Sequence, residues 1–432
     1  MIVNEYTIPG MHVRDHTMTV PLDWNKPEDG RTIEVFAREV VDPARRNDDL
    51  PLLAFLQGGP GGKSPRPSGL DGFMGPALKR FRVILLDQRG TGRSTRIQGD
   101  RMAAFATGEE GAEYLLNFRA DSIVRDFDFI REHEFKVGKW STLGQSYGGF
   151  LTLTYLSMAP ESLSACYVAG GLAAICPSAE EVYRRTYPRV SAKNIQFYDR
   201  YPHDVESIGR IADFLDAGEV RLPDGDLLTV RRLQLLGIDF GMKPGFERVH
   251  WLFDEAWTDG ASERRVLSDA FLADVMQKTS YDDNPLFMVL QESIYGQGTG
   301  ATNWAAARER KLHSEFDSGR RPLFFTGEMM FPWMLDEIRS LRPFKAAAET
   351  LAQTKDYSSL YDLDRLKSNE VPVSAVAYHD DMFVDVGLSL ETAANVGNVH
   401  AWVTNEFEHD GLHGPDVAEK LFRHTEETTG MR

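Results

Sequence analysis

Gly144-Gln145-Ser146-Tyr147-Gly148 is the stretch that decides the fold, and Gly149 follows it directly. It lies between an apolar, β-prone run, Trp140 to Leu143, and a run that can form a helix, Phe150 to Met158. A serine at the apex of a strand-turn-helix unit is a nucleophile elbow, whereas an ordinary Gly/Ser loop is the alternative interpretation. The flanking glycines suit the elbow because they tolerate angles and close approaches that a Cβ would block. The following helix start favours negative charge developing beside the serine.

Strands and helices alternate on both sides of this turn. Strand patterns occur at Met18 to Trp24, Thr32 to Val40, Leu52 to Leu56, Arg82 to Leu86 and Leu163 to Ala169, with a helical spacing of apolar residues from Ala120 to Phe135. Such alternation predicts a mainly parallel sheet that is covered by helices on both faces.

The pattern changes after Gly170-Gly171. From about Leu172 to Leu366 almost every segment has a helical pattern, and strand patterns return only at Val371 to Tyr378 and Asn398 to Thr404. We therefore predict an α/β fold with a mainly parallel central sheet and a large all-helical cap inserted before the last strands. The expected division is residues 1–171 as the first part of the core, 172–366 as the cap and 367–432 as the last part of the core.

A glycine-rich segment, Gln57 to Gly62, follows the strand that ends at Leu56. Its uncovered backbone N–H groups can point at an anion or an oxyanion. Gly62-Lys63-Ser64 resembles the end of a phosphate-binding P-loop, but that motif requires a glycine at position 57 and a helix next, which Pro65 and Pro67 disfavour. An oxyanion-hole loop is the favoured interpretation, and a plain glycine loop is the alternative.

The strand that begins at Arg82 is followed by a compact polar segment, Asp87 to Ser94. A solvated charged turn is one interpretation of it. At the end of a core strand, however, such a cluster more often braces a neighbouring loop through charge-assisted hydrogen bonds. We expect a supporting role here and no direct part in chemistry.

The two strands after the helical block carry an acid and a histidine. The first ends in His379-Asp380-Asp381-Met382 and the second in Glu406-Phe407-Glu408-His409-Asp410-Gly411. Serine, acid and histidine in this chain order are expected when the serine lies on an elbow. The histidine would take the serine proton and the carboxylate would orient its ring. Asp381 and His409 are the preferred residues, and Asp380, Asp385 and His413 are the nearest rivals.

Other interpretations of these residues exist. The aspartates are also typical of turns, and a histidine flanked by acids is also typical of a solvated surface pair. His409, Asp410 and His413 could ligate a metal, but Gly411, Gly414 and Pro415 disfavour a helix that presents both histidines on one face, and no third ligand is evident. We therefore expect no metal and no cofactor.

Composition narrows the class of protein. The 432 residues carry a net charge of −17, which argues against nucleic acid and anionic membrane surfaces and suits a cationic small substrate. Only Cys166 and Cys176 are present, so there is no disulfide framework. The N-terminal residues lack the pattern of a signal peptide, and no apolar run is long enough to span a membrane. A cytoplasmic protein is expected, and the sequence leaves its oligomeric state open.

With these features in place, the chain resembles the α/β-hydrolases and, more narrowly, the prolyl aminopeptidases or proline iminopeptidases of the longer bacterial type. Three motifs carry the resemblance: Gln57-Gly58-Gly59-Pro60-Gly61, the segment Asp87 to Ser94, and Gly144 to Gly149. Cap stretches and the 379–382 motif extend it over nearly the whole chain: Asn284 to Phe287, Gln291 to Tyr295 and Phe325 to Met334. One departure is Gln57, where much of the family has histidine.

The resemblance implies a serine exopeptidase that releases N-terminal proline from short peptides, with Ser146, Asp381 and His409 as catalytic residues. It further implies that the N–H groups of Gly59 and Tyr147 form the oxyanion hole. In this family acidic cap side chains hold the cationic amine of the substrate; Glu292 is the first choice, followed by Glu247 and Glu328. Phe150, Tyr295 and Trp333 are candidates for a proline-sized pocket. An esterase or a broader aminopeptidase is the alternative, and a non-catalytic binding protein on the same fold is a remote one.

Overall fold

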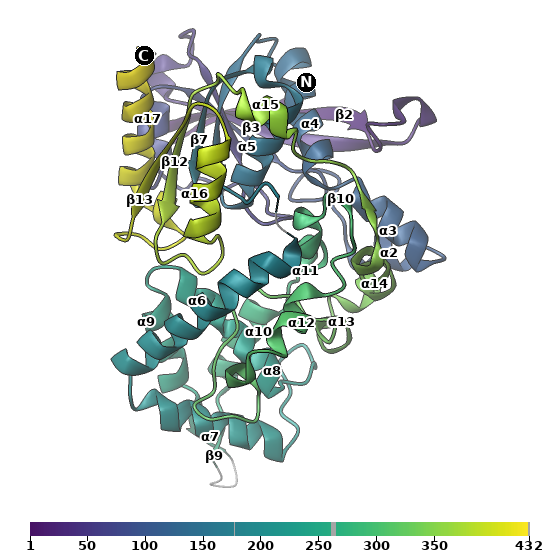
Figure 1. Cartoon of the computed structure of the whole chain (residues 1–432), viewed down its shortest axis with the longest axis vertical. Helices are drawn as coiled ribbons and strands as arrows, with labels where there is room; N and C mark the ends of the chain where they lie inside the picture. The colour runs from purple at the N-terminus through teal and green to yellow at the C-terminus, as the bar shows by residue number, and fades with distance from the viewer. Residues whose placement is uncertain (177, 261–264, 431–432) are drawn as a thin grey trace.

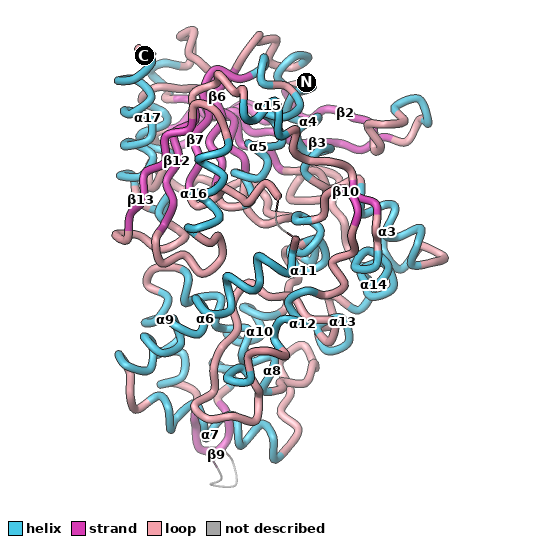
Figure 2. The backbone as a smooth tube through the Cα atoms, viewed as in Figure 1, coloured by secondary structure: helices cyan, strands magenta, loops and turns pink. Residues whose placement is uncertain are grey.

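A nine-stranded sheet organises the computed structural model, which describes residues 1–176, 178–260 and 265–430 (Figures 1 and 2). The antiparallel part of the sheet consists of β1 (Ile2–Ile8), β2 (Met11–Pro21) and β3 (Thr32–Val41). The parallel part continues in the spatial order β5 (Arg82–Asp87), β4 (Leu52–Leu56), β6 (Trp140–Gln145), β7 (Leu163–Ala169), β12 (Val373–Tyr378) and β13 (Val399–Thr404). The predicted, mainly parallel α/β sheet is therefore confirmed.

Both faces of the parallel strands are buried. In β4, Leu53 and Phe55 pack into one apolar cluster, while Leu52, Ala54 and Leu56 pack into the other. Successive side chains of a strand point to opposite faces, so a strand with apolar residues at every position needs cover on both sides. Helices cover both faces. One face is covered by α1 (Met74–Leu78) and α17 (Pro415–Thr429), and the other by α4 (Ala120–His133) and α5 (Tyr147–Met158).

The chain between β7 and β12 is largely helical, and most of it lies below the sheet in Figure 1, whereas its last helix, α15, lies beside the sheet. Its α-helices are α6 (Ala179–Arg200), α7 (Asp204–Ala217), α8 (Val230–Leu233), α9 (Gly245–Asp254), α10 (Asp269–Thr279), α11 (Pro285–Leu290), α12 (Ala305–Arg310), α13 (Met334–Glu337), α14 (Lys345–Gln353) and α15 (Leu363–Lys367). Outside this block the remaining α-helices are α2 (Gly99–Ala103), α3 (Gly108–Leu116) and α16 (Val386–Asn395). α3 packs on α14, so an early segment of the chain joins the helical block.

Two short two-stranded sheets interrupt the helical block, and the sequence patterns did not predict them. They pair β8 (Trp257–Asp259) with β9 (Arg265–Leu267) and β10 (Gly298–Thr299) with β11 (Asp356–Tyr357). Strands of two or three residues are too short to show a period, and the β10–β11 pair is far apart in sequence. Their presence does not change the predominantly helical character of the block.

The edge strand β1 was also missed, and the second strand begins seven residues earlier than expected, at Met11 rather than Met18. The β1 side chains are mostly exposed, so apolar and polar residues do not alternate clearly along it. The strand is held by backbone pairing with β2 from Ile2 to Ile8. Such pairing depends on the partner strand and leaves a weak local signal in sequence.

The carboxyl ends of the parallel strands meet at one edge of the sheet, as they must in a parallel arrangement. The segments that follow β4, β5, β6, β7, β12 and β13 all begin at this edge, which faces the helical block (Figure 1). Contacts between the two parts include a hydrogen bond from the His409 N–H to the Gly241 carbonyl, 3.0 Å, and one from the Lys243 ammonium to the Glu406 carbonyl, 2.6 Å.

Candidate active site

Ser146 occupies the sharp turn between β6 and α5. Its backbone angles are φ 56° and ψ −122°, a conformation that non-glycine residues rarely adopt. Two hydrogen bonds hold it: its N–H donates to the Ala169 carbonyl, 3.0 Å, and its carbonyl accepts from the Gly149 N–H, 2.8 Å. Strain of this kind persists only where the surroundings enforce it, and it is typical of functional positions.

The glycines around the turn are required by close backbone packing. A Cβ on Gly148 would lie 1.9 Å from the Leu56 carbonyl oxygen, and one on Gly144 would lie 2.4 Å from the Gly148 carbonyl oxygen. A Cβ on Gly149 would lie 2.0 Å from the carbonyl oxygen of Gly171, in the loop after β7. The elbow therefore fits only because these positions lack side chains.

Asp381 and His409 are hydrogen-bonded to each other and buried. The His409 Nδ1 lies 2.7 Å from Asp381 Oδ2, and the two residues are 5% and 1% exposed. The other carboxylate oxygen, Asp381 Oδ1, accepts from the N–H groups of Phe383, 2.8 Å, and Val384, 3.1 Å. The carboxylate is thus fixed by three contacts, and it in turn fixes the imidazole ring.

The rival residues are engaged elsewhere. Asp380 is exposed and bonds the ring of its neighbour His379, 2.8 Å. Asp385 caps α16 and forms an ion pair with Arg189, 2.6 Å. The His413 side chain is 81% exposed and faces Asp410 at 3.4 Å. The structure therefore brings Asp381, and not these aspartates, to His409.

Gly170 and Gly171 lie between Ser146 and His409. A Cβ on Gly170 would lie 3.2 Å from His409 Nδ1, and a Cβ on Gly171 would lie 2.3 Å from the Ser146 carbonyl oxygen. Ser146 and His409 therefore border the same glycine pair, Gly170 and Gly171. Among the described residues, the Ser146 hydroxyl has no hydrogen-bond partner, and catalytic hydrogen bonds are often loose before substrate binds. The role of this glycine pair was not recognised from the sequence.

The pKa of His409 reflects opposing effects. Burial lowers it, but the adjacent Asp381 carboxylate and, more weakly, Glu328 and Asp410 outweigh burial, so the net pKa is raised above the usual value. A raised pKa means that the imidazolium is stabilised by its surroundings. This is the electrostatic arrangement that a general base requires when it accepts a proton.

The glycine-rich loop after β4 runs alongside Ser146. A Cβ on Gly58 would lie 3.1 Å from the Ser146 Cβ, and Gly59 has a φ of 132°. Neither the Gly59 N–H nor the Tyr147 N–H donates to another described residue. Gln57 braces the loop: its amide oxygen accepts from the Gly58 N–H, 3.0 Å, and its amide nitrogen donates to the Lys63 carbonyl, 3.0 Å.

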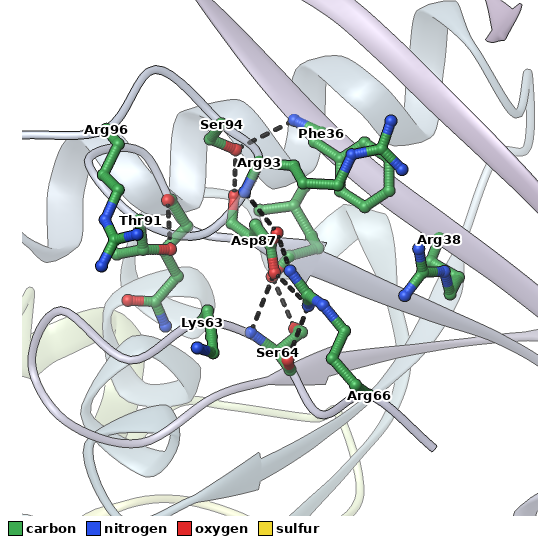
Figure 3. Close-up of polar contacts among 12 residues, drawn as sticks. Phe36, Arg38, Lys63, Ser64, Arg66, Asp87, Thr91, Arg93, Ser94 and Arg96 are labelled. Carbon is green, nitrogen blue, oxygen red and sulfur yellow. Dashed lines mark hydrogen bonds and ion pairs between the residues drawn. The ribbon is translucent and has the colours of Figure 1, made fainter. Parts of the chain in front are cut away.

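Asp87, at the end of β5, fastens the next part of the same loop (Figure 3). One carboxylate oxygen accepts from the Ser64 N–H, 3.1 Å, and from Arg66 Nη1, 2.7 Å. The other accepts from Arg66 Nη2, 2.6 Å, and from the Arg93 N–H, 2.8 Å. The bracing expected for the 87–94 segment is confirmed by these bonds, which are charge-assisted.

Glu292, the first choice from sequence, is buried and already hydrogen-bonded. Its two carboxylate oxygens accept from the N–H groups of Ala305 and Ala306, each at 2.9 Å, at the start of α12. Burial raises the pKa of Glu292 to about 7, although these backbone bonds oppose the shift. This carboxylate therefore caps a helix, which local sequence could not reveal because its partners lie 13 and 14 residues away.

Glu328 is the cap glutamate with an electrostatic connection to the Asp381–His409 pair. Burial raises its pKa to about 7; His409 opposes the shift and Asp381 adds to it. Its neighbour Gly327 packs beside Met382, since a Cβ there would lie 2.8 Å from the Met382 methyl carbon. No Lys or Arg ion pair holds Glu328 within the described chain, and a hydrogen bond with the Gln291 side chain lowers its pKa slightly against the effect of burial.

Glu247 and the aromatic candidates are placed differently. The Glu247 carboxylate on α9 forms an ion pair with Arg200 on α6. Phe150 and Tyr295 pack against each other, with ring centroids 5.9 Å apart, and Tyr295 also contacts Tyr183. Burial raises the pKa of Tyr295, and the charges of Glu328 and Glu292 add to the shift. Trp333 instead stacks on Phe331, and Arg231 lies over its ring at 4.8 Å.

Sheet, elbow and hydrogen-bonded acid–histidine pair define an α/β-hydrolase, and residues 51–213 match the family model described as alpha/beta hydrolase fold. The chain is 44% identical over 424 residues to a proline iminopeptidase from Aeromonas sobria, covering 97% of each chain. It is 33% identical to proline iminopeptidase aneH from Aspergillus aculeatus, covering 91% of this chain and 88% of the relative. The chain belongs to the proline iminopeptidase family.

A solved structure of a proline iminopeptidase from Mycobacterium smegmatis aligns with a TM-score of 0.44 and 16% identity over 95% of this chain and 98% of that chain. None of the described helices combines the length and the apolar character that crossing a membrane requires.

Proposed function

We propose that the chain is a serine exopeptidase that releases N-terminal proline from short peptides. The observation that carries the proposal is the buried Asp381–His409 pair, 2.7 Å apart, which borders the same glycine pair as the strained Ser146. The named proline iminopeptidases support the substrate class, because they align with this chain over nearly its whole length.

Ser146, His409 and Asp381 would act as nucleophile, general base and orienting acid. The hydrogen bond to Asp381 places the proton of neutral His409 on Nδ1, which leaves Nε2 free to accept the Ser146 proton. The Ser146 oxygen then bonds the prolyl carbonyl carbon, and His409 returns the proton to the departing amine of the remaining peptide. Water, activated by the same imidazole, hydrolyses the acyl-enzyme and releases proline.

The N–H groups of Gly59 and Tyr147 would hold the oxyanion formed in these steps. Both are unpaired among the described residues, and Tyr147 begins helix α5, whose dipole favours negative charge. A preorganised donor of this kind contributes about 3–4 kcal/mol to transition-state stabilisation in serine hydrolases. Because the donors are backbone groups, Gln57 in place of the family's histidine leaves them intact.

Glu328 is best placed of the three cap glutamates to hold the substrate amine. Burial raises its pKa to about 7, so the carboxylate ionises near neutral pH, and its charge interacts with those of His409 and Asp381. A cationic amine beside it would stabilise the carboxylate and confine cleavage to the first residue. Glu292 would form the neighbouring wall while capping α12, and Glu247 would act only through its ion pair with Arg200.

The helical block, residues 172–366, would serve as a cap over the site. Glu292, Glu328 and Tyr295 all come from it, whereas the serine, the acid and the histidine come from the sheet. A cap that supplies the amine anchor would limit the enzyme to short peptides with a free N-terminus.

We place the enzyme in the cytoplasm because its two cysteines are free.

A rate panel tests the activity. We expect fast release of p-nitroaniline from prolyl-p-nitroanilide, slower release from alanyl-p-nitroanilide, and none from the acetyl-blocked prolyl compound, because acetylation removes the charge that the cap carboxylates recognise. Steady-state kcat/KM for the three compounds is the measurement. Equal rates on blocked and free prolyl compounds would identify an esterase-like or amidase activity instead, and equal prolyl and alanyl rates would identify a broad aminopeptidase.

Glu328→Gln is expected to raise the KM for prolyl-p-nitroanilide by about 10- to 100-fold with a smaller change in kcat, because a charge-assisted hydrogen bond to the amine contributes about 1.5–3 kcal/mol. The wild-type KM should also rise as pH falls through about 7, where the Glu328 carboxylate takes up a proton and loses its charge. The variant's KM should not change over that range.

Glu247→Gln is the matched control, since Glu247 pairs with Arg200, and we expect its KM within about twofold of wild type. A Glu328→Gln enzyme with wild-type KM and wild-type pH dependence would remove Glu328 from the amine site and leave the serine chemistry untouched.

A further inference from the structure

His203, Asp204 and His250 converge in the helical block, apart from the candidate active site. Asp204 is the first residue of α7, His203 precedes it, and His250 lies on α9. One candidate ligand atom from each lies within 4.8 Å of the other two. The closest approaches are His250 Nδ1 to Asp204 Oδ2, 2.9 Å, and His203 Nε2 to Asp204 Oδ1, 3.4 Å.

The charge of Asp204 has no Lys or Arg partner within the described chain. Its side chain is 4% exposed, and its ion-pair partners are His203 and His250 alone. Two other buried aspartates have arginine partners, Asp226 with Arg232 and Arg342 and Asp126 with Arg89, whereas Asp381 of the candidate site, like Asp204, pairs only with histidine. A buried carboxylate is costly unless it is paired or coordinates a metal, and a bound divalent ion would supply the compensating charge here.

The three donors match a transition-metal ion of the Zn²⁺ class. Two imidazole nitrogens and one carboxylate form a donor set that Zn²⁺, Cu²⁺, Ni²⁺ and Co²⁺ accept, whereas Ca²⁺ and Mg²⁺ prefer oxygen ligands. Ligand atoms around tetrahedral Zn²⁺ lie about 3.3 Å apart, given metal–ligand distances of about 2.0 Å. The His203–Asp204 separation, 3.4 Å, already fits, and because all three ligand atoms lie within 4.8 Å of one another, a small movement of the exposed His203 ring would complete the set.

Solvent access and a rigid backing complete the arrangement. The His203 side chain is 68% exposed, so an ion can enter from its side, while the His250 side chain is only 8% exposed. The Tyr201 ring stacks on His250 at 4.1 Å with an interplanar angle of 5°, which holds that imidazole in place. Trp251, which is 60% exposed, lies with its ring centroid 4.6 Å from that of His250.

We propose that His203, Asp204 and His250 bind one divalent ion of the Zn²⁺ class and thereby tie the start of α7 to α9. The ion would compensate the buried Asp204 charge, with solvent completing its coordination. The two histidines are 47 positions apart in sequence, so no local ligand spacing indicates the site.

Isothermal titration of the full-length, chelator-stripped chain with ZnCl₂ tests the proposal, and we expect one ion per chain. His203→Ala should weaken the affinity at least tenfold without changing the fold, because the side chain is mostly exposed. Asp204→Asn should weaken it as strongly. His379→Ala is the matched control. That side chain is 64% exposed and also bonds an aspartate, Asp380, but it forms no such three-residue cluster with the residues that the structure describes. Its affinity should equal that of wild type.

Tryptophan fluorescence locates the ion independently. Cu²⁺ bound at this cluster should quench Trp251 because the indole lies beside His250. The quenching should disappear in Trp251→Phe and in His203→Ala, and Zn²⁺ should raise the melting temperature of wild type but not of His203→Ala. Absence of one-to-one Zn²⁺ binding, or equal binding by wild type and His203→Ala, would overturn the site. Loss of binding in His379→Ala would do the same.

Discussion

Replacing Ser146 by alanine is expected to lower kcat for prolyl-p-nitroanilide by about 10⁶-fold, comparable to removal of the serine in other serine proteases. The hydroxyl oxygen is the atom that would form the acyl-enzyme, and alanine has no such group. Such a loss corresponds to about 8 kcal/mol of transition-state stabilisation. Steady-state kinetics and labelling by a fluorophosphonate both measure it, and the variant should not be labelled.

The fold should survive this change. The Ser146 hydroxyl has no partner among the described residues, so we expect the free energy of unfolding to change by less than about 1 kcal/mol. Ser141→Ala is the matched control, because Ser141 lies on the same strand, β6, at the end away from the site. Its kcat should stay within about twofold of wild type. Retention of more than a hundredth of wild-type activity by Ser146→Ala would exclude Ser146 as nucleophile.

Asp381→Asn is expected to lower kcat by about 10⁴-fold while the protein stays folded. The asparagine oxygen can keep the bonds from the Phe383 and Val384 N–H groups that Asp381 Oδ1 accepts. Its NH₂ group would then face His409 Nδ1 and donate to it. The His409 proton would move to Nε2, so Nε2 could no longer accept the proton of Ser146. In this variant, we expect the pH dependence of kcat to shift in addition to the fall in kcat.

Asp380→Asn provides the control one position earlier in the chain. Its carboxylate is exposed and bonds His379, so we expect kcat within about threefold of wild type. The two variants decide a choice that the sequence leaves open. Equal losses at both positions, or a larger loss at Asp380, would contradict the assignment of Asp381.

Much of the fold follows from local sequence patterns. The strands 52–56 and 163–169 have the predicted bounds, because continuous apolar runs next to glycine-rich turns are strong signals. The strand β1 and the short β8–β9 and β10–β11 pairs were not predicted, since they depend on a partner strand more than on their own residues. Helical periodicity identified the block between β7 and β12 without giving the arrangement of its helices.

For the candidate site, too, some features follow from the sequence and others depend on tertiary packing. The serine, acid and histidine proposed for the site could be singled out because they lie one, three and five residues beyond the ends of β6, β12 and β13, and parallel strands bring such positions to one edge. The choice between Asp380 and Asp381 depends on which side chain points inward, which adjacent residues in a turn do not reveal. The order that we propose for the cap glutamates also depends on tertiary packing, because Glu292 bonds Ala305 and Glu328 interacts electrostatically with His409.

The order of the strands also has a consequence for biosynthesis. β12 lies directly beside β7 although some two hundred residues separate them in sequence, and β13 follows β12. A ribosome therefore completes the Ser146 turn long before it makes the histidine that would activate it, and pairing so distant in sequence is slow to form. The growing polypeptide would carry a dormant nucleophile, and hydrolytic competence would arise only once β13 and the segment that carries His409 have been made.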